Sequence, residues 1–191
     1  MKPAVFLDRD GTVIEERGYL GRLELIELFP GSAEAIRLLK AAGYAVVIVT
    51  NQAGIARGLF DEAFVQSAHA RLDAMLREDG AVVDGYYYCP HHPDGIVDRY
   101  RLVCGCRKPA PGMVRQAAAA LDIDVARSFV VGDKWLDIGL ARNAGATGVL
   151  VRTGYAGGDD AVPPAGCEPA VIVDTLLDAA GWILAAPAAV R

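Results

Sequence analysis

Two carboxylates follow a short apolar segment near the start of the chain. Residues 4–7 are apolar and lead into Asp8-Arg9-Asp10-Gly11. In an extended segment alternate side chains point the same way, so Asp8 and Asp10 can lie at one site. Neighbouring carboxylates repel unless a cation or a shared proton relieves them, and Mg²⁺ takes oxygen ligands of this kind. The pair fits a Mg²⁺ site and also fits an acidic turn after a strand.

A second acidic motif favours the metal site. A predicted strand over residues 128–131 leads into Gly132-Asp133, and Asp137 follows four residues later. Asp133 would complete an oxygen site for Mg²⁺ with Asp8 and Asp10. Asp137, one helical turn further on, is placed to hold a metal-bound water or to orient Lys134.

Two other motifs have groups that suit a phosphate. The segment Thr50-Asn51-Gln52-Ala53-Gly54 follows an apolar run and offers a hydroxyl and backbone N–H groups. In Arg107-Lys108-Pro109, Lys108 would neutralise a phosphate and Arg107 would form a bidentate fork. Each motif alone also fits an ordinary turn or a solvated pair of surface cations.

Three cysteines and a histidine form a candidate zinc site. Cys89-Pro90-His91 is separated from Cys104-Gly105-Cys106 by twelve residues. Three thiolates and an imidazole form a regular tetrahedral Zn²⁺ set, and four protein ligands leave no open position, so the ion would be structural. His92 is an alternative ligand, and buried free cysteines with a surface histidine are the alternative to a metal. The zinc loop, about 89–106, would hold the following Arg107 and Lys108 in place.

These motifs require elements that bring them together. Apolar runs alternate with helical patterns, which predicts an α/β fold with a doubly wound parallel sheet and helices on both faces. Ligands in such folds bind beyond the carboxyl ends of the strands, which is where most of the polar motifs occur. The expected strands are 4–7, 44–49, 85–88, 128–131, 147–151 and 170–173. A helix is expected after Ser32, ending before Gly43, and a second helix is expected to follow Asp61 as its N-cap and to run to about Arg77. The other expected helices are 111–121, 135–143 and 174–184.

The composition restricts the class of protein. A chain of 191 residues, more than half of them hydrophobic, is long enough for one folded domain over 1–191. A net charge of −5 argues against a nucleic-acid or anionic-membrane binder. We expect a cytoplasmic protein, because the sequence has no signal peptide and no apolar run of about 18 residues.

The motif series as a whole resembles that of haloacid dehalogenase superfamily phosphatases. The resemblance covers residues 4–151 and rests on Asp8-x-Asp10-Gly11-Thr12, Thr50, Lys108 and Gly132-Asp133-x-x-x-Asp137. The zinc loop, residues 54–58 and residues 106–113 narrow it to the branch that includes heptose bisphosphate and histidinol-phosphate phosphatases. No large insertion follows the first two motif strands, which implies a nearly capless enzyme.

The resemblance implies a role for each catalytic residue. Asp8 would attack phosphorus and form an aspartyl-phosphate, while Asp10 would protonate the leaving oxygen and later deprotonate water. Mg²⁺ would be held by Asp8, the backbone carbonyl of Asp10 and Asp133. Thr50 and Lys108 would grip the oxygens of the transferred phosphoryl group.

The resemblance also implies a small-molecule sugar bisphosphate as the substrate. It points to removal of the C7 phosphate of heptose 1,7-bisphosphate, as the β anomer, during synthesis of lipopolysaccharide core precursors, with histidinol phosphate as the alternative substrate. We expect a monomer, and the acidic charge balance argues against binding to nucleic acid or to an anionic membrane. The implied substrate-binding residues are Glu16, Arg17, Gly18, Tyr19, Asn51, Gln52, Ala53, Arg107 and Lys134.

Two other classes of protein account for part of the pattern. A phospho-receiver module also gathers carboxylates at strand ends, but Asp10 would supply an acid–base group that hydrolyses a phosphoaspartate. A zinc-stabilised nucleic-acid-binding protein fits the cysteines but not the acidic charge balance.

Overall fold

Six parallel strands form one sheet in the computed structural model, which describes residues 1–155 and 165–185. The sheet order is β3-β2-β1-β4-β5-β6, so the direction of winding reverses between β1 and β4. Crevices at such switch points are where doubly wound folds bind ligands. The strands are β1 (Ala4–Leu7), β2 (Ala45–Asn51), β3 (Gly85–Cys89), β4 (Phe129–Gly132), β5 (Thr147–Val151) and β6 (Val171–Val173).

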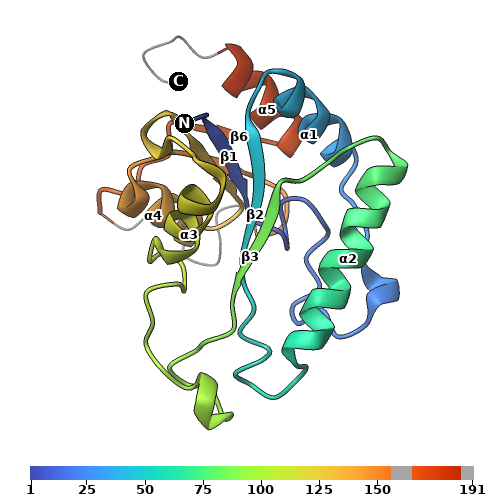
Figure 1. Ribbon diagram of the computed structural model, residues 1–191, viewed down its shortest axis with the longest axis vertical. Helices are drawn as coiled ribbons and strands as arrows, with labels where there is room; N and C mark the ends of the chain where they lie inside the picture. The colour runs from blue at the N-terminus through green and yellow to red at the C-terminus, as the bar shows by residue number, and fades with distance from the viewer. Residues whose placement is uncertain (156–164, 186–191) are drawn as a thin grey trace.

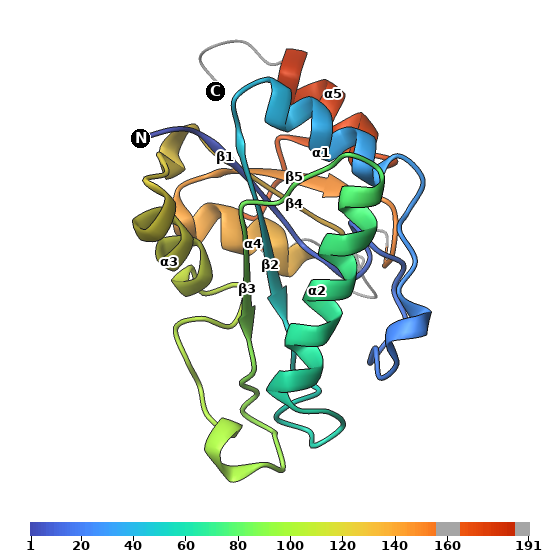
Figure 2. The ribbon, with the colours of Figure 1, turned by 45° about the vertical axis from the view of Figure 1, so that its right-hand side comes forward.

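Helices cover both faces of the sheet, which confirms the doubly wound fold. Figure 1 shows α3 and α4 on one side and α1, α2 and α5 on the other, and Figure 2 gives the same grouping. Three short 3-10 turns, η1 (Leu23–Leu25), η2 (Asp98–Tyr100) and η3 (Val125–Arg127), lie in the connections. The helices are α1 (Ser32–Ala41), α2 (Glu62–Glu78), α3 (Gly112–Leu121), α4 (Trp135–Ala144) and α5 (Leu176–Ala185).

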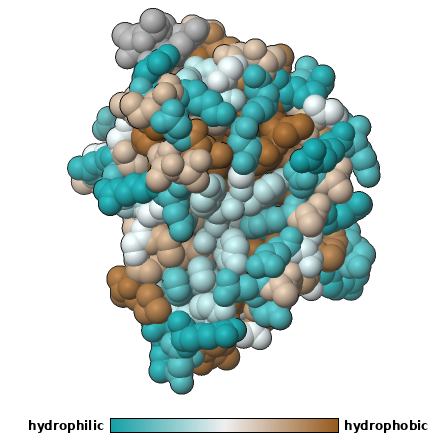
Figure 3. Space-filling model, in the orientation of Figure 1, coloured by the Kyte–Doolittle hydropathy of each residue, from teal (hydrophilic) through white to brown (hydrophobic). Residues whose placement is uncertain are grey.

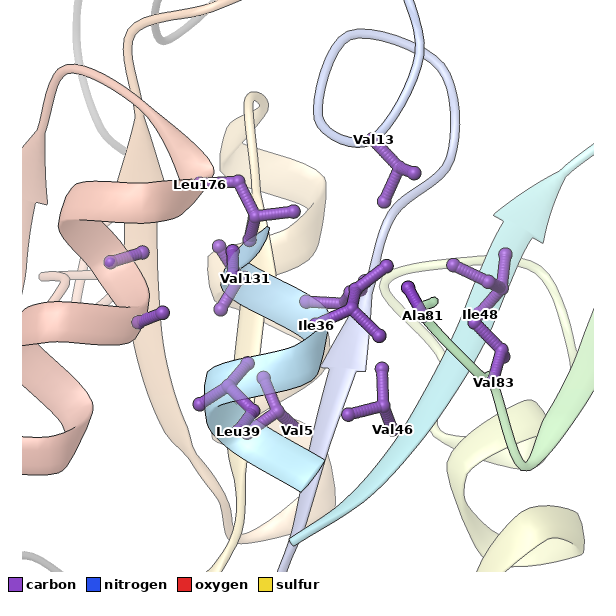
Figure 4. Close-up of a cluster of buried hydrophobic side chains, with 14 of the residues drawn as sticks. Val5, Val13, Ile36, Leu39, Val46, Ile48, Ala81, Val83, Val131 and Leu176 are labelled. Atoms are coloured by element: carbon purple, nitrogen blue, oxygen red, sulfur yellow. The ribbon is translucent and has the colours of Figure 1, made fainter. Parts of the chain in front are cut away.

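The continuous apolar runs become strands that are buried on both faces. In β1, Val5 and Leu7 belong to the core under α1, α2 and α5, whereas Ala4 and Phe6 belong to the core under α3 and α4. Figure 4 shows the first core, where valines of three strands face Ile36 and Leu39 of α1. The central strands are thereby fixed from two sides.

Local hydrogen bonds set where several elements begin. The Asp61 carboxylate accepts the Phe64 N–H at 2.8 Å, which confirms Asp61 as the N-cap of α2. The last helix begins at Leu176, two residues later than expected, because Thr175 and Asp178 exchange backbone-to-side-chain hydrogen bonds at its first turn.

Two strands continue further than the sequence indicated. Thr50 pairs with Tyr88 and Asn51 with Cys89, so both polar residues lie in β2 and not in the following turn. Strand β4 begins at Phe129, one residue later than expected, because the Ser128 hydroxyl accepts the backbone N–H of Ala4 at 2.9 Å. The polar side chains therefore leave rigid strand ends.

The connections near the carboxyl ends of β1 and β2 are short or compact. Ten residues separate β2 from α2, and the longer segment between β1 and α1 contains only η1 among named elements. This agrees with a nearly capless fold. A second long connection joins β3 to α3 through η2 and extends from the lower end of the sheet in Figure 1.

The surface is consistent with the acidic, mixed composition. On the face seen in Figure 3, hydrophilic residues separate the hydrophobic areas from one another. None of the described helices combines the length and the apolar character needed to cross a membrane. The single domain over 1–191 stays a prediction, and it includes residues 156–164 and 186–191, which lie outside the described residues.

Candidate active site

A cavity of about 270 Å³ opens at the carboxyl ends of β1, β2 and β4. The sequence predicted that the polar motifs lie beyond the carboxyl ends of the strands, and the strand order places this cavity at the switch point of the sheet. Its lining combines acidic, basic and hydroxyl side chains from segments far apart in the sequence. Among them are Asp8, Asp10, Thr50, Arg107, Lys108, Lys134 and Asp137.

Lys108 joins two carboxylates in the floor of this cavity. Its Nζ donates to Asp8 Oδ1 and to Asp137 Oδ1, both at 2.6 Å. All three side chains are almost fully buried. Charge-assisted hydrogen bonds this short fix the position of the Asp8 oxygens relative to the end of β1.

Asp133 brings a third carboxylate to the same place. Its Oδ2 accepts the Tyr155 N–H at 2.9 Å, while its buried Oδ1 has no hydrogen-bond partner among the described residues. Oxygens of Asp8, Asp133 and Asp137 lie within 4.8 Å of one another. An all-oxygen donor set with one unpartnered oxygen fits Mg²⁺, which binds proteins through a few carboxylates.

The crowding of these acids changes their protonation. Burial raises the pKa of Asp8 to about 8; Lys108 opposes this rise, and Asp137 and Asp133 add to it. Burial and the Asp137 carboxylate raise the pKa of Asp133 to about 6. For Lys108, burial disfavours the ammonium, but Asp137 and Asp8 outweigh it and raise its pKa. The cluster therefore favours the binding of an additional cation.

Two glycines, Gly11 and Gly154, pack closely against the carboxylate of Asp133. A Cβ on Gly154 would overlap Asp133 Oδ2 and would lie 2.6 Å from the Cα of Gly11. Thr153, two residues after β5, donates from Oγ1 to the Gly11 carbonyl at 2.7 Å. The loops after β1 and β5 are thus tied together around the carboxylate.

The carboxylate of Asp10 lies outside the acidic cluster, which differs from the expectation that Asp8 and Asp10 share one side-chain site. Strand β1 ends at Leu7, and Gly11 has φ +89°, so the alternation of an extended strand does not continue to Asp10. Arg9 and Gln52 hold the Asp10 side chain instead. Only its backbone carbonyl remains as the ligand that the resemblance implied.

The expected phosphate-binding groups lie around Asp10 and Lys108. Gln52 Nε2 donates to Asp10 Oδ2 at 3.0 Å and to Thr50 Oγ1 at 2.8 Å. Asn51 lines the cavity and also accepts the Lys108 N–H at 3.0 Å through its side-chain oxygen. Asn51 therefore positions the Lys108 backbone.

The segment after β1 reaches the cavity with some of its expected residues. Gly18 and Tyr19 line the cavity, and Glu16 pairs with Lys134 at 3.1 Å. Arg17 is not among the lining residues, because its guanidinium is paired with Glu15 and Glu27 at 2.5 Å. Arg17 is thus placed away from the position expected of a substrate-binding residue.

Sequence reasoning missed several lining residues. Arg9 and Tyr155 line the cavity, as do the apolar Leu20, Phe60 and Leu136. Arg9 could have been found from its place between the two aspartates, and Tyr155 from its place just after the fifth strand. The apolar residues carry no signal, since only the fold brings them to the cavity.

Cys89, His91, Cys104 and Cys106 form one compact cluster in the loop between β3 and α3. The three sulfur–sulfur separations are 3.0, 3.3 and 3.5 Å, and His91 Nδ1 lies 3.3 Å from Cys106 Sγ and 3.7 Å from Cys89 Sγ. A tetrahedral Zn²⁺ with bonds of about 2.0–2.3 Å places its ligand atoms at similar separations. His92 instead accepts the Asp94 N–H at 3.1 Å.

This loop is joined to the rest of the site. Glu62, in the first turn of α2, accepts hydrogen bonds from Tyr88 at 2.6 Å and from Tyr100 at 2.5 Å. Arg107 Nη1 donates to the carbonyl of His91 at 3.3 Å. The cluster and its contacts thereby define where Arg107 and Lys108 enter the cavity.

The doubly wound sheet, with Asp8 and Asp133 at its switch point and Lys108 between carboxylates, defines a phosphatase of the haloacid dehalogenase type. Residues 5–139 match the family model described as polynucleotide kinase 3 phosphatase, and residues 105–179 match the one described as HAD-hydrolase-like. The chain belongs to the haloacid dehalogenase superfamily of phosphatases.

Its relatives carry a more specific name. The chain is 49% identical over 153 residues to D-glycero-beta-D-manno-heptose-1,7-bisphosphate 7-phosphatase of Salmonella typhi, covering 80% of this chain and 81% of the relative. The Yersinia pestis enzyme of the same name is 50% identical over 154 residues, with the same coverage.

Solved structures agree with these relatives. The D,D-heptose 1,7-bisphosphate phosphatase of B. bronchiseptica, complexed with magnesium and phosphate, superposes with a TM-score of 0.81 at 36% identity and covers 96% of this chain and 98% of that chain. The enzyme of that name from Burkholderia thailandensis gives 0.69 at 31% identity, covering 97% and 100%.

Proposed function

We propose that this chain removes the 7-phosphate of D-glycero-β-D-manno-heptose 1,7-bisphosphate. The observation that carries this assignment is the near-50% identity, over about four-fifths of each chain, to enzymes of that name. The relatives favour this substrate over histidinol phosphate. We place the reaction in the synthesis of lipopolysaccharide core precursors.

In the first half-reaction, Asp8 attacks phosphorus and becomes an aspartyl-phosphate. Asp8 is suited to this role because Lys108 fixes its carboxylate just after the carboxyl end of β1, where it lines the cavity. Asp8, Asp133 and the Asp10 carbonyl would hold Mg²⁺, with Asp137 nearby. When bound, the metal neutralises charge on the phosphoryl oxygens and on the crowded carboxylates.

Asp10 transfers the protons. Its carboxyl group donates a proton to the leaving sugar oxygen, and the resulting carboxylate accepts a proton from the water that hydrolyses the aspartyl-phosphate. This assignment is supported by the position of Asp10 on the cavity wall, outside the acidic cluster. Two aspartates two residues apart thus perform different steps.

The remaining polar groups orient the substrate. Thr50 and Lys108 contact the transferred phosphoryl group, and Arg107 and Lys134 contact the rest of the bisphosphate. Burial disfavours the charged form of Lys134, but Asp133, Asp8 and Glu16 raise its pKa, so it remains a cation for an anionic ligand. Glu16, Gly18, Tyr19, Gln52 and Ala53 shape the wall around them.

We assign a structural Zn²⁺ to Cys89, His91, Cys104 and Cys106. A closed set of four ligands leaves no position for a reacting group. The ion would fix the loop that leads directly into Arg107 and Lys108. Its effect on catalysis would thus be indirect.

We further infer a single-domain monomer that acts in the cytoplasm without nucleic acid or membrane. The net charge of −5 argues against binding to nucleic acid or to an anionic membrane.

Steady-state kinetics tests the proposed substrate. We expect the β anomer of heptose 1,7-bisphosphate to give the highest kcat/KM among a panel with the α anomer, fructose 1,6-bisphosphate and histidinol phosphate. Each assay is run with Mg²⁺ and with a chelator. A higher kcat/KM for histidinol phosphate would overturn the assignment.

A further inference from the structure

The guanidinium of Arg9 is almost completely buried beside the proton-transferring aspartate. Its side chain is 2% exposed. Nε donates to Asp10 Oδ2 at 3.1 Å, and Nη2 donates to Asp10 Oδ1 at 3.0 Å. A buried arginine is costly unless it is paired, and this one is committed to the residue that directly follows it.

A second donor, from the segment that follows β2, holds the same carboxylate. Gln52, just after β2, donates from Nε2 to Asp10 Oδ2 at 3.0 Å. Thr50 Oγ1 lies 3.4 Å from that oxygen. Among the described residues, Oδ2 therefore faces three donor groups, whereas Oδ1 accepts a hydrogen bond from Arg9 alone. The two oxygens of Asp10 are not equivalent.

The neighbouring histidine does not compete for Arg9. Burial lowers the pKa of His69 to about 3, and the positive charge of Arg9 contributes to that shift. His69 is thus neutral at ordinary pH. The charged partner of Arg9 in the described part of the chain is Asp10.

We propose that Arg9 is a positioning residue for proton transfer. Its rigid fork sets the plane of the Asp10 carboxyl group, with Gln52 fixing Oδ2, so that Oδ1 carries the proton toward the leaving oxygen. This rests on the proposed role of Asp10 as the acid. General acid catalysis requires such alignment, since the proton must lie within hydrogen-bond reach of the oxygen that receives it.

Arg9 assists the transfer of the phosphoryl group from the leaving oxygen to Asp8. A bond forms between an Asp8 oxygen and phosphorus, while the bond from phosphorus to the leaving oxygen breaks. The electron pair of the broken bond remains on the leaving oxygen, which takes the proton from Asp10. Misalignment of Asp10 therefore slows the departure of a basic alkoxide far more than that of a stable phenolate.

This difference supplies the experiment. Single-turnover phosphoryl transfer is measured for Arg9→Gln with heptose 1,7-bisphosphate, phenyl phosphate and p-nitrophenyl phosphate. We expect a loss of about 10²-fold with the heptose ester, and of no more than about threefold with p-nitrophenyl phosphate, whose leaving group needs no proton. Equal losses on all three esters, or no loss on the heptose ester, would overturn the proposal.

Arg9→Lys separates charge from geometry. Lysine keeps the positive charge but loses the planar fork. We therefore expect Arg9→Lys, like Arg9→Gln, to lose much more rate with the heptose ester than with p-nitrophenyl phosphate. Recovery of the wild-type profile in Arg9→Lys would show that charge suffices and would reject positioning. Arg77→Gln, which removes an exposed arginine paired with Asp73 on α2, is the matched control and should leave all three rates unchanged.

Two readouts keep the test decisive. If circular dichroism shows that Arg9→Gln is unfolded, Arg9→Lys and Gln52→Leu are measured with the same esters, and a uniform loss in both overturns the proposal. If wild-type enzyme does not hydrolyse heptose bisphosphate, the proposed substrate fails. The phenyl and p-nitrophenyl esters still report the change in leaving-group dependence.

Discussion

The ammonium of Lys108 lies 2.6 Å from the Asp8 carboxylate, and both side chains are almost fully buried. One hundred residues separate them in the sequence. Lys108 arrives from the loop that the cysteine cluster shapes, whereas Asp8 leaves the central strand. The pair therefore connects the site of phosphoryl attack to the candidate zinc loop.

Asp8→Asn tests the assignment of the nucleophile. The amide has the same shape but is a poor nucleophile, so we expect Mg²⁺-dependent phosphate release to fall by at least about 10⁴-fold. The fold should persist, because Lys108 keeps Asp137 as a partner. Asp122→Asn, at the exposed end of α3, is the control. Substantial residual turnover would reject Asp8 as the nucleophile.

Lys108→Met tests how the acidic cluster is neutralised. Removing one partner of a buried ion pair costs about 3–5 kcal/mol, and we expect the free energy of unfolding without added Mg²⁺ to fall by that amount. Mg²⁺ should then stabilise the variant more than the wild type, since the carboxylates depend more on the metal. Urea denaturation with and without Mg²⁺ measures both effects.

Lys40→Met provides the comparison for that experiment. Lys40 pairs with Asp84 at 2.7 Å away from the cavity, so its loss should not alter the response to Mg²⁺. Equal stabilisation of wild type and Lys108→Met by Mg²⁺ would contradict the role given to the lysine.

Elements with a strong local signal were predictable from the sequence. Strand β1 coincides with the apolar run 4–7, and α2 begins directly after its N-cap Asp61. Burial on both faces and side-chain capping are properties of a segment by itself. The extension of β2 to Asn51 was not predictable, because it depends on pairing with β3.

The directions of polar side chains were less predictable. Asp10 turns from the acidic cluster because Arg9 and Gln52 hold it, and Arg17 turns to Glu15 and Glu27. Both side-chain directions depend on which of several possible hydrogen-bond or ion-pair partners is chosen, and the spacing of residues in the sequence does not determine that choice. Asp8 and Lys108, by contrast, line one cavity and contact each other, because the strand end and the loop before Lys108 leave each side chain little freedom.

Gly132→Ala tests the close packing behind the metal site. A Cβ at this position would overlap the carboxyl group of Asp137, which must then move away from Lys108. We expect weaker Mg²⁺ binding and a lower kcat. Calorimetric titration with Mg²⁺ measures the first effect. Gly181→Ala, where a Cβ meets open space in α5, should leave both unchanged. Normal Mg²⁺ affinity in Gly132→Ala would contradict the argument.

His69→Phe should flatten the acid dependence of stability. The pKa of His69 is lowered from 6.5 to about 3, mainly by burial, so below pH 6.5 the unfolded chain binds a proton that the native protein does not. Native stability is therefore lost as pH falls from 6.5 toward 3, by up to about 1.4 kcal/mol per pH unit. Phenylalanine keeps the ring contact with Tyr86. Parallel wild-type and variant curves of unfolding free energy between pH 7 and 4 would refute this.

Cys104→Ser tests whether the cysteine cluster holds zinc. We expect about one zinc per chain in the wild type, and loss or strong weakening of binding in the variant, because one of four ligands is removed. Since structural zinc contributes to folding free energy, thermal stability should fall as well. Cys167→Ser is the matched control, because Cys167 packs with Ile138 and Leu150 and lies outside the cluster. Elemental analysis decides: wild-type protein without zinc rejects the site, while equal zinc in both variants rejects Cys104 as a ligand. If zinc positions Lys108, kcat should fall in Cys104→Ser and remain normal in Cys167→Ser.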